Sequence, residues 1–251
     1  MLIAARNAFM AGKRWKNPYV TNGLIAMWDG EWNAGGGVHD STATTWKNLV
    51  PNSPFGNGER AGSNLVSDVV WTSQSCYPAD TYTANAWRCC FNVSVALADT
   101  LAVLCGETVA RIRAYNGDGW SASAAMGCDI RLAASATNRV RPAATFAYSS
   151  TQYQFWDCVQ NAAVVSLDPT VLRSYHVRRD GSGLGLRING GAEVVGGKGG
   201  GVTKTIGDVF PLILVGVSAP EVCCIRYYSR ALTADEIAHN YAIDKARFNL
   251  P

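Results

Sequence analysis

The sequence predicts an all-β fold in which two antiparallel sheets pack as a sandwich, with a short N-terminal arm and one C-terminal helix. Three observations support this fold. Charged residues make up only 16% of the 251 residues, while glycine (25), tryptophan (8) and tyrosine (10) are abundant. This composition is typical of closely spaced strands joined by tight turns. Short apolar runs alternate with turn residues along most of the chain, and one strong helix signal stands near its end.

The first 20 residues are expected to form an arm that precedes a single domain spanning residues 21–251, since sandwiches of this size need not split. Residues 2–10 carry a short helical stripe of apolar side chains, which Gly12 ends. This arm either packs on the side of the domain or attaches the protein to a partner. Arg6 and Asn7 interrupt the apolar stretch, so it does not fit a secretory signal. No window of the sequence approaches a membrane span.

Strands are expected at regular intervals after the arm. The first covers residues 23–28 and ends at the turn residues Asp29 and Gly30, and a glycine-rich loop follows through residue 40. Residues 116–119, with the sequence Asn-Gly-Asp-Gly, form a clear turn. The other strands of this region are expected at 45–50, 69–71, 89–95, 109–113, 129–132, 144–148 and 153–156.

Two successive hairpins are predicted between residues 175 and 195. Asp180 and Gly181 form the first turn, and Asn189 and Gly190 form the second. Apolar side chains alternate with glycine and arginine over residues 184–188, which is the pattern of a strand with one buried face. Further strands are expected at 211–216 and 221–228.

A helix is predicted directly after the last strand. Thr233 is placed to cap its N-terminus, and Glu236 stands at the position that completes a capping box. Leu232 before the cap and Ile237 in the first turn are spaced to form a hydrophobic staple.

The order of these elements resembles the laminin-G-like and concanavalin A-like lectin domains. The resemblance rests on the strand Gly-Leu-Ile-Ala-Met-Trp at 23–28 and on residues 174–248, which contain Leu-x-Leu-x-Ile-Asn-Gly and Arg-Ala-Leu-Thr. It implies a jelly roll of the concanavalin A type that binds sugars or protein surfaces without catalysis. Residues 1–30 also resemble lectin-like proteins of phages and prophages of gut bacteria. That resemblance implies a virion component, such as a fibre, tail appendage or capsid decoration.

The partners expected from this resemblance are a glycan or bacterial surface and other virion proteins. The implied location is the virion, assembled in the bacterial cytoplasm and released by lysis, or otherwise outside the cell. We expect a homo-oligomer, because several linked copies turn weak sites into strong binding. Nucleic acid is not an expected partner, since the net charge is only +3 and no lysine or arginine run occurs. Membrane insertion is not expected either.

The eight cysteines are predicted to be free thiols that act as small apolar residues. Two adjacent pairs, 89–90 and 223–224, lie in strand-like runs, where neighbouring side chains point to opposite faces and do not bridge each other. No CxxC or Cys/His spacing indicates zinc. Disulfides formed after release are the alternative.

Sugar binding requires an aromatic platform with amide or carboxylate side chains beside it. Trp120 is the first choice for this platform, because the preceding turn would hold it outside the strand ladder. The candidate carbohydrate-binding residues are Trp120 with Asn116 and Asp118, Trp32 with Asn33, and Trp156 with Asp157. The alternative for each tryptophan is a place in the core, where Trp28, Trp46 and Trp71 are assigned outright. No cofactor is expected, with calcium as the alternative left open and no metal ligand assigned.

The protein is predicted not to be an enzyme. Asp29 and Glu31 come nearest to the paired carboxylates of a glycoside hydrolase, but a turn aspartate and a solvated glutamate are the simpler interpretation. His39, His176 and His239 fall in different predicted elements, and His176 is expected to be packed structurally. Two alternatives stay open, a purely structural virion protein that binds no glycan and a glycan-cleaving enzyme on the same fold.

Overall fold

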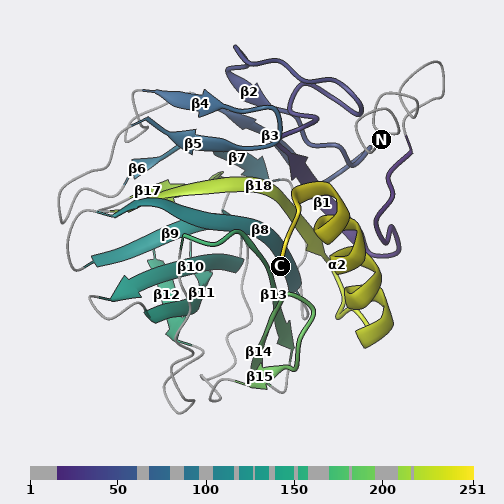
Figure 1. Cartoon of the computed structure of the whole chain (residues 1–251), viewed down its shortest axis with the longest axis vertical. Helices are drawn as coiled ribbons and strands as arrows, with labels where there is room; N and C mark the ends of the chain where they lie inside the picture. Colours follow the sequence, from purple (N-terminus) through teal and green to yellow (C-terminus); the bar gives the residue numbers. More distant parts are fainter. Residues whose placement is uncertain are drawn as a thin grey trace.

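The computed structural model describes most of the chain, and the described part is built from antiparallel strands and one C-terminal helix (Figure 1). This confirms the predicted all-β class. The described residues are 16–60, 68–79, 88–95, 104–115, 119–126, 128–135, 139–149, 152–157, 170–180, 183–195, 209–215 and 218–251.

The largest sheet has eight strands in the order β15-β14-β13-β8-β18-β5-β4, with β1 also pairing with β18. Strand β18 is therefore central, since β8 pairs with one of its edges while β1 and β5 pair with the other. The strands are β1 (Leu24–Asp29), β4 (Val69–Trp71), β5 (Cys76–Pro78), β8 (Leu104–Tyr115), β13 (Arg173–Asp180), β14 (Gly183–Ile188), β15 (Val194–Val195) and β18 (Ser218–Tyr228).

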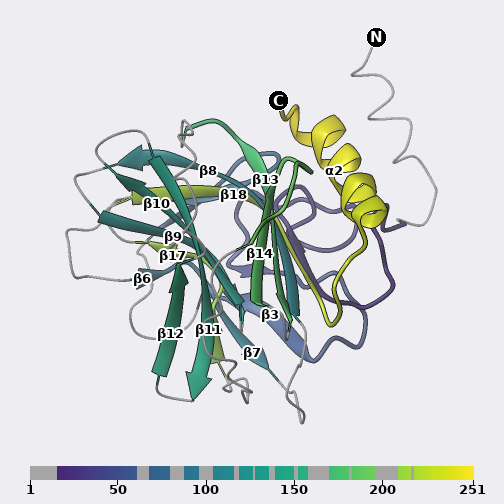
Figure 2. The same ribbon diagram turned by 90° about the horizontal axis from the view of Figure 1, so that it is seen from below.

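A four-stranded sheet in the order β12-β11-β10-β9 forms the second layer, in which β9 packs against β18. Figure 2 shows this sheet on one side of β13 and β14 and the helix α2 on the other. Two smaller sheets, β16-β7-β3-β2 and β17-β6, complete the sandwich. Their strands are β2 (Thr45–Trp46), β3 (Phe55–Glu59), β6 (Arg88–Cys89), β7 (Asn92–Val95), β9 (Gly119–Met126), β10 (Cys128–Ser135), β11 (Arg139–Ser149), β12 (Gln152–Asp157), β16 (Val209–Pro211) and β17 (Leu214–Val215).

The two hairpins predicted near residue 180 are present. Strand β13 pairs with β14 so that Val177 faces Leu186, and β14 pairs in turn with β15. Asn189 and Gly190 have φ angles of 50° and 66°, the left-handed pair that a tight hairpin turn requires. A side chain at Gly190 would meet the ring of Tyr241 at 2.9 Å, so both backbone conformation and space favour glycine there.

Helix α2 (Ala234–Phe248) begins as predicted. The Thr233 hydroxyl accepts a hydrogen bond from the Glu236 amide at 3.3 Å, and the Glu236 carboxylate accepts one from the Thr233 amide at 2.8 Å. Leu232 and Ile237 are buried together against Cys105, which confirms the staple. The helix thus starts at a position that its own sequence specifies.

The core assignments of three tryptophans are confirmed. Trp28 and Trp46 are fully buried and Trp71 is nearly so. Trp46 packs edge-on against Trp71, with ring centroids 5.5 Å apart, and both rings contact Phe91. These rings fill the space between β2, β4 and the residues that precede β7.

The thiol prediction is confirmed for four of the five cysteines whose side chains the structure describes. All five are buried, and burial raises the pKa of Cys76, Cys223 and Cys224. These thiols therefore stay protonated and pack as small apolar groups. The free thiols are those of Cys76, Cys105, Cys223 and Cys224, and Cys90 is buried as well.

The described end of the expected N-terminal arm, residues 16–20, packs along α2. The Tyr19 hydroxyl donates to Asp244 at 2.8 Å, and the Val20 amide donates to Asn240 at 3.0 Å. Residues 1–15 lie outside the described residues, so the attachment role of the arm stays a prediction. Within the described ranges, no helix is long and apolar enough to cross a membrane.

Candidate functional site

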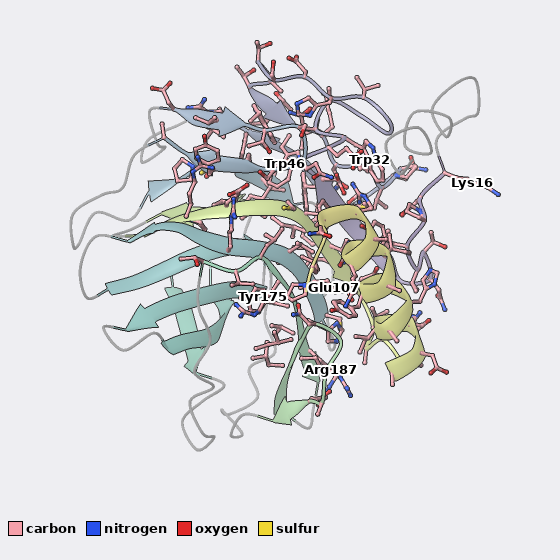
Figure 3. All side chains as sticks on the ribbon, in the orientation of Figure 1. Lys16, Trp32, Trp46, Glu107, Tyr175 and Arg187 are labelled. Atoms are coloured by element: carbon pink, nitrogen blue, oxygen red, sulfur yellow. The ribbon has the colours of Figure 1, made fainter. Side chains whose placement is uncertain are left out.

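The sheet face beneath α2 carries buried charged side chains on three neighbouring strands, β8, β13 and β18. Glu107 on β8 lies opposite Arg226 on β18 and opposite His176 on β13. Residues directly opposite each other in antiparallel strands share a face, so the register alone brings these three charges together. Figure 3 shows Glu107 on the side of the sheet where α2 lies.

Helix α2 completes this cluster with Asp244 and Asn240. The Arg226 guanidinium donates to Glu107 at 2.9 Å and to both oxygens of Asp244, one of them at 2.9 Å. Asn240 donates to the same Glu107 oxygen at 2.8 Å. Arg226, Asp244 and Asn240 are fully buried. The contact between the Arg226 guanidinium and the Asp244 carboxylate is bidentate and shielded from water. It therefore fixes the position of the helix on the sheet.

His176 supplies the second positive charge of the cluster. Its Nε2 lies 3.3 Å from the Cys105 sulfur, and its Nδ1 lies 3.4 Å from Glu107. Burial by itself would lower the pKa of His176, but the hydrogen bonds to Cys105 and Glu107 outweigh it and raise the pKa to about 9. The imidazole is therefore protonated at neutral pH. Two carboxylates, Glu107 and Asp244, then face two cations.

The order Cys105, His176, Glu107 has the form of a nucleophile, a base and an orienting acid. All three side chains are buried, with exposures of 0%, 3% and 2%. A substrate has no access to the thiol while α2 is docked, so the triad acts in packing. This confirms the structural role predicted for His176.

Asp29 and Glu31, the candidate catalytic acids, are both held by Arg247 of α2. The guanidinium lies 2.8 Å from Asp29 and 2.8 Å from Glu31. Asp29 is fully buried, and its carbonyl oxygen accepts a hydrogen bond from the Trp46 indole. One cation thus binds both acids, so they belong to a structural ion-pair network and do not face an open cleft as a free pair.

Trp32 and Asn33 were expected to offer a sugar platform, and the structure corrects this. Trp32 is buried, and the Arg247 guanidinium lies 3.9 Å from the centre of its ring. Asn33 is also buried and exchanges two hydrogen bonds with the backbone of Asp40 in its own loop. Trp32 thus holds the loop on α2 and Asn33 holds the loop together, so neither side chain is exposed as a platform for a ligand.

The expectation that a turn holds Trp120 outside the ladder is wrong. Trp120 is the second residue of β9 and pairs with Ala133 of β10. Trp156 and Asp157 end β12, on the opposite edge of the same sheet, where Trp156 pairs with Ala144. The structure therefore does not bring the predicted tryptophan sites together. Asn116 and Asp118 lie outside the described residues, so the binding role of this turn stays a prediction.

The described residues offer no site for the calcium ion that the sequence analysis left open. None of their His, Cys, Asp and Glu side chains form a group of three or more suited to hold an ion. His39 lies 3.0 Å from the carbonyl oxygen of Gly30, and Asp40 accepts two hydrogen bonds from Thr42. These contacts are those of ordinary turn residues.

A second charged cluster lies farther along β8 and is partly exposed. Arg111 faces Glu221 across the β8–β18 ladder, and Cys76 faces Val222, which brings Tyr77 beside Glu221. Arg111 donates to Glu221 at 2.8 Å, and the Arg113 guanidinium lies 3.8 Å above the Tyr77 ring. We call Arg111, Arg113, Tyr77 and Glu221 the arginine patch.

Sequence reasoning missed both clusters. The available signal was the presence of single charges inside apolar strands, such as Glu107 between Gly106 and Thr108 and Arg226 between Ile225 and Tyr227. Such charges are buried only when paired, which indicates partners elsewhere in the chain. Their partners lie far away in sequence, 133 residues in the Asn240–Glu107 contact and 146 in the Ser75–Glu221 contact, so no local motif reveals them.

These features define a β-sandwich whose C-terminal helix is clamped to one sheet face by buried ions. Comparison of the sequence with known family models and with characterised proteins finds no match. Solved structures do match the fold, among them the receptor-binding domain of a neurotoxin, the binding domain of a mosquitocidal protein and a sialidase.

The "Botulinum Neurotoxin Type G Receptor Binding Domain" matches with a TM-score of 0.51 and 13% identity, over 89% of this chain and 52% of that chain. The binding domain of Paraclostridial Mosquitocidal Protein 1 matches with a TM-score of 0.53 and 11% identity, over 87% and 52%. Trypanosoma rangeli sialidase, in complex with 2,3-difluorosialic acid, matches with a TM-score of 0.53 and 11% identity, over 98% and 38%. The chain thus spans about half the length of the two binding domains and less of the sialidase, and at these identities the likeness shows the fold alone.

Proposed function

We propose that this protein is a non-catalytic binding domain that recognises carbohydrate on a cell or mucosal surface. The observation that carries the proposal is the sandwich fold, which the binding domains of a neurotoxin and of a mosquitocidal protein share over most of this chain. The resemblance of residues 174–248 to laminin-G-like and concanavalin A-like lectin domains supports the same function. Binding sites of this kind lie in loops at the rim of a rigid scaffold.

The turn between β8 and β9 is the proposed binding site. Asn116, Asp118 and Trp120 combine an aromatic ring with polar side chains over five residues. Trp32 and Asn33 are no longer candidates, because Arg247 and Asp40 occupy them. Trp156 and Asp157 remain a separate second candidate at the far edge of the sheet.

Glycan cleavage is the second candidate function, favoured by the likeness to a sialidase. A retaining hydrolase needs two carboxyl groups that face the scissile bond. The acids that the sequence offered for this role, Asp29 and Glu31, are instead bound to Arg247. This geometry supports binding without catalysis by that pair.

The virion setting rests on the resemblance of residues 1–30 to phage and prophage proteins. In that setting the chain is a homo-oligomeric fibre, tail appendage or capsid decoration, and its copies multiply weak glycan contacts. The competing proposal is a structural virion protein that touches no glycan. Capsid or tail genes beside the coding gene, and a native mass several times 26.8 kDa, are the expected results.

A glycan array probed with the labelled full chain tests the binding function. We expect binding to a defined set of glycans and a loss of roughly tenfold in affinity for Trp120→Ala, about the energy of one stacked ring. Trp156→Ala tests the second candidate site, at the opposite edge of the same sheet. A loss of binding for Trp156→Ala and not for Trp120→Ala would place the site there. Absence of binding to every glycan would overturn the proposal, and release of new reducing ends would favour the enzyme.

A further inference from the structure

We propose that the arginine patch is a subsite for the carboxylate or sulfate group of an anionic glycan, with Arg113 as its main contact. This inference rests on the proposed glycan-binding function and narrows it to a ligand class. Its basis is the imbalance of charge within the patch, the fixed orientation of Arg113 and the position of the patch beside the β8–β9 turn.

The patch holds two cations and one anion. One oxygen of Glu221 accepts a hydrogen bond from Ser75 at 2.7 Å, and the other accepts from Arg111 at 2.8 Å. Arg113 approaches that second oxygen only to 3.6 Å, beyond hydrogen-bond length. In the described part of the chain, no other carboxylate pairs with Arg113. The patch therefore keeps one positive charge that its own acid does not neutralise.

Arg113 is held in place although its charge is not neutralised. Its guanidinium lies 3.8 Å from the centre of the Tyr77 ring, a cation–π contact that restrains the position of the group. Its side chain is still 43% exposed, and that of Arg111 is 40% exposed. A pre-oriented guanidinium offers two parallel N–H donors to a carboxylate or sulfate and loses little entropy on binding.

The two arginines lie on the same side of the sheet, since both guanidinium groups approach the same oxygen of Glu221, at 2.7 and 3.6 Å. The pairing of β8 with β13 ends at Ala110, so Arg111 and Arg113 lie beyond the last residue of β8 that β13 covers. Arg113 lies two residues before Tyr115, the last residue of β8, which is roughly 7 Å of extended strand. A charged substituent on a sugar bound at the β8–β9 turn can therefore reach Arg113.

Binding of the full chain to three soluble polysaccharides tests this subsite. The probes are a carboxylated polymer (polygalacturonate), a sulfated polymer (dextran sulfate) and a neutral polymer (dextran), each measured at low and high salt. We expect at least one anionic polymer to bind roughly tenfold more tightly than dextran at low salt, as one charge-assisted contact provides. The preferred anionic polymer identifies the charged group.

Arg113→Met keeps the apolar stem on Tyr77 and removes the guanidinium. We expect it to lose roughly tenfold in affinity for the preferred anionic polymer and nothing for neutral glycans. Arg113→Lys keeps the charge but not the planar fork, so an intermediate loss is expected. Lys47→Met is the control, since it removes one exposed charge elsewhere. If Arg113→Met does not fold, as judged by circular dichroism, Arg113→Lys carries the test.

Equal losses for Arg113→Met and Lys47→Met would show a general charge effect and overturn the subsite. Wild-type affinity of both Arg113 variants for anionic polymers would overturn it as well. If array glycans bind but anionic ones bind no more tightly than neutral ones, the subsite fails and the glycan-binding function stands. If no glycan and no polymer binds at all, the proposed function is overturned, and the subsite that rests on it is overturned as well.

Discussion

Arg226 is at the centre of the buried cluster beneath α2, which we call the α2 cluster. Its other members are Glu107, His176, Asn240 and Asp244. Arg226 is fully buried, and its guanidinium pairs with Glu107 from the sheet and with Asp244 from the helix. A buried ion pair adds little net stability compared with an apolar pair, but removing one partner leaves an uncompensated charge in a dry environment. The cost of such a change is therefore much larger than the gain from the pair.

Asp244→Asn tests this asymmetry at the level of one residue. The substitution keeps the size of the side chain and leaves the Arg226 charge only partly compensated, so we expect a loss of about 3–5 kcal/mol in the free energy of unfolding. Urea denaturation followed by circular dichroism measures it. Asp235→Asn removes an exposed acid from the first turn of the same helix and should cost about 0.3–1 kcal/mol. Similar losses for the two variants would contradict the buried-pair interpretation.

The Arg247 side chain contacts several side chains that the sequence analysis considered as site residues, so they are not free to meet a ligand. It binds Asp29 and Glu31 and covers the ring of Trp32. The sequence places Asp29, Glu31 and Trp32 within four residues, where they look like an acid pair next to a sugar platform. In the fold, Arg247 of α2, more than 200 residues later in the sequence, contacts all three side chains. They therefore form part of the surface on which α2 packs.

Among the elements, α2 is the one whose start is encoded locally. Its capping box and staple lie within six residues, Leu232 to Ile237, and both were predictable from that stretch alone. The hairpin turn at Asn189 and Gly190 is equally local, since both residues adopt positive φ at low cost. Strand β9 is different. The sequence predicts a turn at residues 116–119, directly before Trp120. Trp120 nevertheless belongs to β9, because it pairs with Ala133 of β10.

Thr233→Ala tests the cap of α2. Loss of the hydroxyl leaves the Glu236 amide without its partner, so we expect a loss of about 1 kcal/mol in the free energy of unfolding. Thermal denaturation measures the change. Thr233→Ser restores a hydroxyl and should recover most of the stability. If serine and alanine behave alike, the hydroxyl does not cap the helix.

At the scale of the complete fold, the charge balance of the α2 cluster predicts sensitivity to alkaline pH. The folded pKa of His176 is about 9, raised above the value of about 6.5 expected in the unfolded chain. A raised pKa contributes stability that is fully present below about pH 6.5 and is lost as the pH rises through 9. Loss of the proton leaves Glu107 and Asp244 facing Arg226 alone.

Measurement of urea midpoints from pH 6 to pH 10 checks this prediction. We expect the free energy of unfolding to fall by up to about 3 kcal/mol over that range, the equivalent of the His176 pKa shift. His176→Gln keeps a polar side chain without a titrating proton, so its profile should be flatter. Parallel profiles for the two proteins would show that another group controls the alkaline limit.

Features that depend on a few neighbouring residues could be predicted before any fold was known. These include the all-β class, the hairpin turn at Asn189–Gly190, the N-terminus of α2 and the burial of Trp28 and Trp46. Propensity, turn chemistry and apolar periodicity act over short stretches, so they can be recognised in the chain itself.

Long-range contacts decide which polar side chains remain accessible to a ligand. This could not be predicted from short stretches of the sequence. The α2 cluster draws residues from β8, β13, β18 and α2, and the arginine patch draws residues from β5, β8 and β18. A charge is stable in a dry interior only beside its counter-charge, and strand pairing across the whole chain sets that neighbour. Whether an acid or an aromatic ring packs the fold or meets a ligand therefore depends on contacts between residues far apart in sequence.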